Sequence, residues 1–497
     1  MSRNNRLQII TGHKLDRTND ESSDKFHDEC AVVGVIGNAE AANYCYLGLY
    51  AMQHRGQEGA GIVSTNGTEM RAYRDMGLVA DVFDEDRLSM LSGTAAIGHA
   101  RYATFGGKDW ENLQPFSANF GENSFAIAHN GNLINADKLR SELEQKGAIF
   151  STTSDSEVIL HLIAHATDQD TIPKKLEAAF QRLRGAFSLV VLGLHRLIAV
   201  RDAYGVRPLS LGKIGDGYIV ASETCAFDLI GAQFVRDIEP GEMLEITADG
   251  KLTSYKPLTN KNNNPAFCVF EYIYFARPDS TIDGLNVYKV RKALGAELAK
   301  EHPIDADIVI PVPDSGVPAA IGYAEHSGIP MEFGLIRNHY VGRTFIEPQQ
   351  SIRNFGVKIK LNANRDVLDG KRVIVVDDSI VRGTTSKKIV TMLRNAGAKE
   401  IHFRVSSPPT TGPCYYGIDT PSREELIAST HDIEGIRSYI NVDTLAYLSE
   451  EGIYRAVGKS QKGYCDACFT GNYRLGELMS CVSNVKVGSI GNGHGRK

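Results

Sequence analysis

One stretch of this chain constrains its fold more than any other. Four consecutive apolar residues, 373–376, are followed directly by Asp377 and Asp378. The apolar run predicts a strand buried on both faces, as in a parallel sheet. The small and hydroxylated residues after it, 379–385, predict a turn into a helix. A helix N-terminus at the carboxyl end of a parallel strand has free backbone N–H groups, which suit a phosphate.

The two carboxylates would then lie beside that phosphate. Carboxylate oxygens accept hydrogen bonds from ribose hydroxyls or help to hold a divalent cation, which prefers oxygen ligands. A second apolar run, 308–310, precedes another turn, Pro-Asp-Ser-Gly at 313–316. The alternative interpretation is an acidic strand end that caps an ordinary helix and binds no ligand.

These two strand ends resemble the signature of the phosphoribosyltransferases, with two acidic residues and a Gly/Thr-rich loop after an apolar strand. The resemblance implies that the phosphoribosyl group is bound by Asp377, Asp378, Ser379, Arg382, Gly383, Thr384 and Thr385. It also implies that Ser315, Asp377 and Asp378 hold Mg²⁺, which would make pyrophosphate leave more readily.

The hydrophobic pattern divides the chain into two parts. From residue 30 to about 255, short β-type runs alternate with Gly and Asn turns, and the amphipathic segments 155–166 and 172–184 predict helices. Such elements are typical of two stacked sheets flanked by helices. After a polar, turn-rich linker at 256–265, strands and helices alternate, which predicts a parallel α/β sheet.

Cys30 stands immediately before the apolar run 31–36, a position where a lone cysteine is usually buried core. The polar clusters that follow it are 53–58, 98–102, 129–133 and 154–157. Singly they are ambiguous: Asn130-Gly131 is a common type I′ hairpin turn, and Arg101 or Asp155 alone would be a surface charge. In this order and spacing they resemble the glutamine amidotransferases of the N-terminal nucleophile class.

That resemblance implies that residues 1–29 are a propeptide whose removal makes Cys30 the first residue; a plain extension is the alternative. The α-amine of Cys30, with a reference pKa near 8, would then be the base for its own thiol. Asn130 and the Gly131 amide would form the oxyanion hole. Glutamine would be bound by Arg55, Gly56, Arg101 and Asp155. Ala31 departs from the class, which usually has Gly after the nucleophile.

Together the two halves resemble the amidophosphoribosyltransferase family over about residues 30–470. The family implies that glutamine, phosphoribosyl pyrophosphate and water give 5-phosphoribosylamine, pyrophosphate and glutamate, the first committed step of de novo purine biosynthesis. It implies an αββα N-terminal-nucleophile hydrolase sandwich followed by an α/β parallel-sheet phosphoribosyltransferase domain. Residues 340–346 match the family's mobile loop.

We therefore expect four segments: a propeptide at 1–29, a glutaminase domain at 30–262, a phosphoribosyltransferase domain at 263–475 and a flexible tail at 476–497. A chain of 497 residues exceeds what one hydrophobic core usually supports, which fits two domains.

Four of the eight cysteines match the ligands of the iron–sulfur form of the family, namely Cys268, Cys414, Cys465 and Cys468. Thiolates are the ligands that such a cluster takes, but from the residues alone a Cys₄ zinc site is equally consistent. The resemblance favours a 4Fe-4S cluster with a structural role.

Composition limits the partners. A net charge of −6 supplies no broad basic field, which argues against nucleic acid, and no apolar run approaches the roughly 18 residues of a membrane span. Residues 1–29 are hydrophilic, so we expect no secretory signal, a cytoplasmic location and reduced cysteines. The family further implies purine-nucleotide inhibitors and a homotetramer.

Two rival functions remain at this point. One is a nucleotide-responsive, non-catalytic regulator with the same fold. The other joins the same glutaminase to a sugar isomerase, as in glucosamine-phosphate synthesis, although the acidic pair and its phosphate loop argue against it.

Overall fold

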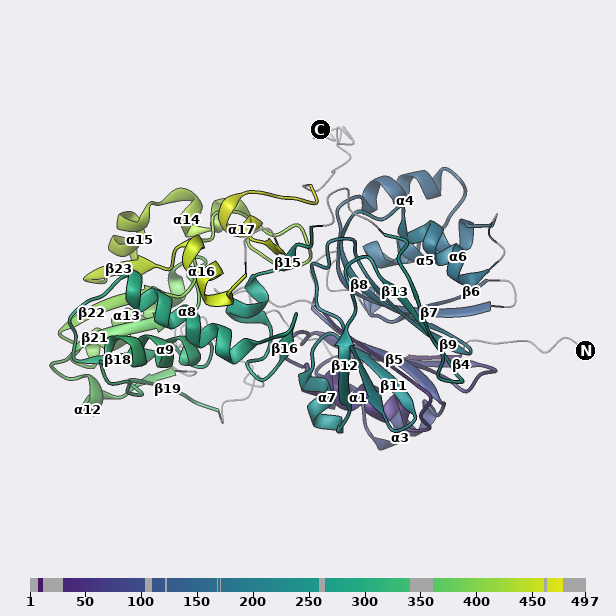
Figure 1. Ribbon diagram of the computed structural model, residues 1–497, viewed down its shortest axis with the longest axis horizontal. Helices are drawn as coiled ribbons and strands as arrows, with labels where there is room; N and C mark the ends of the chain where they lie inside the picture. Colours follow the sequence, from purple (N-terminus) through teal and green to yellow (C-terminus); the bar gives the residue numbers. More distant parts are fainter. Residues whose placement is uncertain are drawn as a thin grey trace, which may run out of the picture.

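The computed structural model describes residues 8–11, 30–102, 110–120, 123–167, 169, 171–258, 264–339, 361–459 and 463–476. Its two halves lie side by side, with the N-terminal half on the right of Figure 1 and the C-terminal half on the left.

The N-terminal half contains two stacked sheets. The first has eight strands in the order β1 (Gln8–Thr11), β4 (Met70–Met76), β3 (Gly59–Thr65), β5 (Ala95–Arg101), β2 (Ala31–Ile36), β11 (Gly217–Ala221), β10 (Ser210–Ile214) and β12 (Gln233–Asp237). The second has six, in the order β14 (Leu252–Tyr255), β13 (Met243–Thr247), β9 (Arg196–Arg201), β8 (Gly185–Gly193), β7 (Asn123–Leu133) and β6 (Phe116–Phe120). All pairs are antiparallel except β1 with β4.

Alternation along the strands explains the stacking. On β2, Val33 and Val35 face the layer of helices, whereas Val32 and Ile36 face the second sheet. The first sheet is covered by α1 (Ala41–Ala51) and α7 (Cys225–Ile230), with α2 (Val79–Val82) and α3 (Glu85–Met90) beside them. The second is covered by α4 (Ala136–Glu144), α5 (Asp155–His165) and α6 (Ile172–Phe180). The predicted αββα sandwich is confirmed.

The C-terminal half is built on a parallel sheet of four strands: β18 (Ile308–Pro311), β21 (Arg372–Asp377), β22 (Glu400–Val405) and β23 (Thr444–Tyr447). On β21, Ile374 and Val376 pack toward α8 (Val287–Glu301) and α9 (Val317–Ser327). Val373 and Val375 pack toward α13 (Thr384–Asn395) and α15 (Ile433–Ile440) on the other face. Burial on both faces is why this strand is apolar throughout, as expected.

Short elements complete this half. They are η2 (Glu271–Phe275), β16 (Thr281–Ile282) with β17 (Leu285–Asn286), β19 (Leu335–Arg337) with β20 (Leu361–Ala363), β15 (Phe267–Cys268) with β24 (Tyr464–Cys465), α12 (Arg365–Leu368), η3 (Arg423–Glu425), α14 (Ile427–Thr430), α16 (Glu450–Val457) and α17 (Ala467–Thr470). A further turn of 3₁₀ helix, η1 (Trp110–Asn112), lies in the N-terminal half.

The two halves share a hydrophobic cluster. Ile134, Ala186 and Val206 of the N-terminal half pack with residues 266–276 of the C-terminal half. Next to it, the Asn132 amide donates to the Tyr415 carbonyl at 3.0 Å. The halves therefore meet through packed side chains.

The hairpin-turn alternative for Asn130-Gly131 is wrong, because both residues lie inside β7, paired with Ser188 and Phe187 of β8. The expected mobile loop at 340–346 and residues 477–497 of the flexible tail expected at 476–497 lie outside the described residues. No helix within the described ranges is long and apolar enough to cross a membrane.

Candidate functional site

Cys30 lies at the start of β2, where the first residue of the strand, Ala31, pairs with Ala100 of β5. The residue is 8% exposed, and its thiol donates to the Tyr102 carbonyl at 3.7 Å. The strand pairing therefore places the thiol next to the carboxyl end of β5, which carries Arg101.

Asn130 and Gly131 lie in the facing sheet, on β7. The Asn130 side chain is fully buried, and neither its Oδ1 nor its Nδ2 has a hydrogen-bond partner among the described residues. A buried amide without partners costs free energy, so its retention calls for a ligand or a reaction intermediate as partner. Gly131 has φ +143°, and a Cβ there would lie 2.1 Å from the Ala186 carbonyl oxygen, so only glycine fits.

A contact between two buried histidines joins the two sheets near this point. His99 of β5 contacts the His129 carbonyl of β7 through Nε2 at 3.1 Å. Burial lowers the pKa of His99 to about 3 and also lowers that of His129, so both rings are neutral at physiological pH. His129 in turn contacts Ser156 Oγ through Nδ1 at 2.9 Å. The contact between His99 and the His129 carbonyl fixes Asn130, the next residue on β7, relative to the strand that ends in Arg101.

Arg101 and Asp155 are both buried, so the surface-charge alternative is wrong for each. The Arg101 guanidinium donates to the Asn112 carbonyl at 2.6 Å. Asp155 Oδ2 accepts the backbone N–H of Leu133 at 3.0 Å, which ties the first turn of α5 to the end of β7. The two charges predicted to bind glutamine are thus held on elements that flank Asn130.

Arg55, which the resemblance assigns to the glutamine pocket, lies in a buried network of ion pairs. Its guanidinium is fully buried in ion pairs with Glu223 and Glu271. The adjacent Gly56 packs against β5, because a Cβ there would lie 2.4 Å from the Ala100 carbonyl carbon. A role for Arg55 and Gly56 at the glutamine pocket stays a prediction.

Glu223 and Glu271 were missed by the sequence interpretation. Each is fully buried, and their partners are distant in the chain. No local pattern marks such a pair. A glutamate inside the otherwise apolar and aromatic run 270–275 was the available signal, since an unpaired charge is rarely buried.

In the C-terminal half, Asp377 ends β21 and Asp378 follows it, and each residue is 2% exposed. Asp377 Oδ1 accepts the backbone N–H of Asp378 at 3.0 Å, and Ser379 Oγ donates to Asp378 Oδ2 at 2.6 Å. The alternative of an acidic cap is not observed, because the residue that precedes α13 is Gly383 and no side chain caps the helix. Gly383 has φ +78°, a left-handed conformation that favours glycine.

The rest of this loop leads into the helix. Thr384 and Thr385 form the first turn of α13. Arg382 forms an ion pair with Glu425 at 2.9 Å. These positions surround the N-terminus of α13, where free backbone N–H groups suit a phosphate.

The loop that carries Ser315 packs against the same strand end. Val312 N–H donates to the Val376 carbonyl at 2.9 Å, and a Cβ on Gly316 would lie 2.4 Å from that carbonyl oxygen. Strands β18 and β21 are parallel neighbours, so their carboxyl ends form one edge. Ser315 and the acidic pair together offer a hydroxyl and two carboxylates, a donor set that fits Mg²⁺.

The four predicted cysteine ligands line one pocket, together with Phe270, Phe275 and Tyr416. Strands β15 and β24 pair Cys268 with Cys465, and the Tyr416 N–H donates to Cys414 Sγ at 3.3 Å. Burial raises the pKa of the Cys465 thiol to about 12 and holds those of Cys268 and Cys468 well above the ordinary value.

Within the described ranges, no three His, Cys, Asp or Glu side chains already converge at ligand spacing. The four cysteines nevertheless line one pocket. A soft, all-sulfur donor set in a dry pocket fits an iron–sulfur cluster or Zn²⁺ rather than a hard cation.

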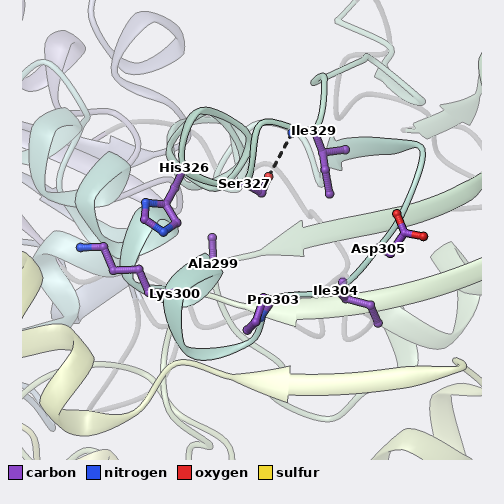
Figure 2. A pocket seen from close by; sticks show the side chains of 8 residues that line it. All are labelled: Ala299, Lys300, Pro303, Ile304, Asp305, His326, Ser327 and Ile329. Carbon is purple, nitrogen blue, oxygen red and sulfur yellow. Dashed lines mark hydrogen bonds between the residues drawn. The ribbon is translucent and has the colours of Figure 1, made fainter.

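A further pocket lies at the opposite edge of the parallel sheet, between the C-terminal ends of α8 and α9 (Figure 2). Lys300, His326 and Asp305 line it, and Ile329 N–H donates to Ser327 Oγ at 3.3 Å. Residues 303–305 precede β18, so this pocket is at the amino-terminal edge and the acidic pair is at the carboxyl edge. Helix C-termini carry partial negative charge, which disfavours a phosphate there.

Comparison with known proteins agrees with this division. The family model described as a glutamine amidotransferase domain matches residues 99–228, and the one described as a phosphoribosyl transferase domain matches residues 283–415. An amidophosphoribosyltransferase of Bacillus subtilis (strain 168) is 52% identical over 454 residues, covering 90% of this chain and 94% of the relative. Amidophosphoribosyltransferase 1, chloroplastic, of Arabidopsis thaliana is 51% identical over 92% of this chain and 81% of the relative.

Solved structures show the same likeness. One described as the allosteric regulatory enzyme of purine biosynthesis is 51% identical, with a TM-score of 0.86 over 90% of this chain and 96% of that one. Another, the glutamine phosphoribosylpyrophosphate amidotransferase from B. subtilis complexed with ADP and GMP, is 51% identical with a TM-score of 0.85 over 90% and 97%. Identity at this level over nearly the whole of both chains confirms the resemblance: the chain belongs to the amidophosphoribosyltransferase family.

Proposed function

We propose that this enzyme releases ammonia from glutamine at Cys30 and transfers it to phosphoribosyl pyrophosphate at the Asp377–Asp378 edge, giving 5-phosphoribosylamine, pyrophosphate and glutamate. The observation that carries the glutaminase half is the buried, unpartnered amide of Asn130, held on β7 opposite the strand end beside Cys30. Family membership supports the overall reaction and its place as the first committed step of de novo purine biosynthesis.

In the glutaminase half, the Cys30 thiolate attacks the side-chain carbonyl carbon of glutamine. The α-amine of Cys30 takes the thiol proton and returns it to the departing ammonia. The oxyanion of the tetrahedral intermediate accepts hydrogen bonds from Asn130 Nδ2 and the Gly131 N–H. Water then hydrolyses the thioester to glutamate. Arg101 would hold the substrate carboxylate and Asp155 its ammonium group.

This mechanism requires Cys30 to carry a free α-amine, so we also propose that residues 1–29 are removed as a propeptide. Within that segment the structure describes only β1, which pairs in parallel with Arg71–Arg74 of β4. The pairing supports a segment that docks at the sheet edge before its removal.

In the transferase half, the N-terminus of α13 would bind the 5-phosphate, and Asp377 and Asp378 would accept hydrogen bonds from the ribose hydroxyls. Ser315 and the two carboxylates would hold Mg²⁺, whose charge would stabilise pyrophosphate as it leaves. Ammonia then attacks the anomeric carbon that pyrophosphate leaves. The domain boundaries proposed for these two halves remain 30–262 and 263–475.

We propose that the cysteine pocket holds a 4Fe-4S cluster, supported by its four thiols and its dry, aromatic lining. The cluster would fasten β24 and α17 to the start of the transferase domain, and zinc is the competing occupant. Purine nucleotides are proposed as inhibitors, since the B. subtilis relative is complexed with ADP and GMP. On the basis of the family we also propose a homotetramer and a cytoplasmic location. Light scattering would test the tetramer by its mass.

A paired-donor assay tests the proposal. Phosphoribosylamine formation is measured with glutamine and with ammonium chloride, for the native enzyme and for Cys30→Ser. We expect the variant to lose glutamine-dependent activity and to keep ammonia-dependent activity. No product from either donor in the native enzyme would favour the non-catalytic regulator, and amination of fructose phosphate would favour the sugar-isomerase rival.

A further inference from the structure

The interface between the two domains contains four buried charges that balance. Glu271, from the transferase side, receives Arg55 at 2.5 Å and Arg207 at 3.1 Å, both from the glutaminase side. Arg55 also pairs with Glu223. All four side chains are 0–1% exposed. Because each charge is out of water, each depends on its partners for compensation.

Glu223 forms the reciprocal half of this arrangement. It belongs to the glutaminase side, and its Oε2 accepts from Ser280 Oγ at 2.6 Å and from the Arg277 N–H at 2.9 Å, both on the transferase side. Burial alone would raise the pKa of Glu223, but Arg55 and His54 outweigh it and hold the pKa well below its ordinary value. Each domain thus inserts one buried carboxylate among groups of the other.

Arg55 connects this network to the glutaminase site. The next residue, Gly56, packs on β5, since its Cβ would lie 2.4 Å from the Ala100 carbonyl carbon and 2.7 Å from Arg101 N. Glu58 N–H donates to the Arg101 carbonyl at 3.0 Å, so the same segment is bonded to the strand end. A displacement of the Arg55 guanidinium would therefore move backbone that borders Arg101 and Cys30.

We propose that Glu271 is a positioning residue for the glutaminase reaction, a transferase-domain carboxylate that fixes Arg55 and thereby the 55–58 segment against the end of β5. The inference rests on the proposed function, because it assumes that glutamine binds beside Arg101. It assigns to the transferase domain a part in shaping the glutamine pocket, through Arg55. The aromatic helix η2 supplies the rigid base, because Tyr272, Ile273 and Phe275 around Glu271 are buried.

The test compares Glu271→Gln with a matched variant, Glu245→Gln. Glu245 is also buried and also pairs with an arginine, Arg196 at 2.5 Å, but both lie within the six-stranded sheet. Glutamate release, phosphoribosylamine formation from each donor and the thermal midpoint are measured for both. We expect Glu271→Gln to lower kcat/KM for glutamine by up to about 100-fold, since small misplacements near a reaction centre have effects of that size.

Ammonia-dependent activity of Glu271→Gln should stay close to that of the native enzyme, and Glu245→Gln should keep both activities. Glu271→Asp restores the charge, so it should recover part of the glutamine kcat/KM; this variant is the readout if Glu271→Gln does not fold. Unchanged glutamine kcat/KM in a destabilised Glu271→Gln would overturn the proposal, as would equal loss with both donors. A native enzyme that releases no glutamate would instead refute the proposed function itself.

Discussion

The substitution Asn130→Ala tests whether the side-chain amide of Asn130 serves catalysis or stability. Removal of one oxyanion-hole donor typically lowers kcat by about 100- to 1,000-fold, or about 2.7–4 kcal/mol of transition-state stabilisation. The Asn130 amide has no partner among the described residues, so its loss breaks no protein hydrogen bond there. Removing an unsatisfied buried amide relieves a penalty of about 1–3 kcal/mol, which offsets the small cavity that alanine leaves. We expect the free energy of unfolding to change little.

The matched control lies two residues away on the same strand. Asn132 Nδ2 donates to the Tyr415 carbonyl at 3.0 Å across the domain interface. Asn132→Ala should therefore lose about 1 kcal/mol of unfolding free energy while glutaminase kcat is kept. Glutamate release gives kcat, and urea denaturation followed by circular dichroism gives stability.

The pair of variants can refute the reasoning. If Asn130→Ala unfolds more easily than Asn132→Ala while its glutaminase kcat is retained, the buried amide is structural and the oxyanion assignment is wrong. Ammonia-dependent product formation should be unchanged in both variants, which excludes a general loss of the transferase domain.

Three further predictions use other sites. Asp378→Asn should lower ammonia-dependent kcat by at least about 100-fold through lost ribose and Mg²⁺ contacts, without affecting glutamate release; a parallel fall in both would contradict this. Cys414→Ser should lose bound iron and acid-labile sulfide, as measured by elemental analysis, whereas zinc in the native protein would exclude the cluster. Burial would raise the pKa of Glu157, but hydrogen bonds from His161 and the 151–152 turn lower it to about 2. Its contribution to stability is therefore full above its unfolded pKa of about 4.5 and disappears as the pH falls toward 2, so Glu157→Gln should flatten the acid unfolding curve in that window.

Local patterns were enough for most of the fold. The apolar run at 373–376 predicted a strand buried on both faces, and β21 is one, because helices cover the sheet on both sides. The segment predicted as a helix at 172–184 ends earlier, at Phe180, since β8 begins at Gly185 and the chain needs a turn between them. Such strands and helices can be predicted from the sequence because their hydrophobic patterns involve residues that are close together in the chain.

Ion pairs between residues far apart in the chain could not be predicted from the sequence in the same way. The resemblance assigned Arg55 to the glutamine pocket, which stays a prediction, but it gave no sign of the ion pairs of Arg55 with Glu223 and Glu271, which are 168 and 216 residues away. The residues next to Arg55 in the sequence do not show whether its guanidinium pairs with a substrate or with distant carboxylates. Likewise, the pairing of Cys268 with Cys465 follows from β15 and β24, two-residue strands too short to show a pattern.

The reciprocal carboxylates also bear on how such an enzyme could be assembled from parts. A glutaminase unit separated from its neighbour would leave Arg55 and Arg207 without Glu271, and an isolated transferase unit would expose Ser280 and the Arg277 amide without Glu223. Recombination with another acceptor domain would succeed only if the incoming domain supplied a carboxylate at the same place. The two domains of this chain are therefore matched to each other at their interface. A gene fusion that exchanged one domain would also have to preserve the interface residues of the other.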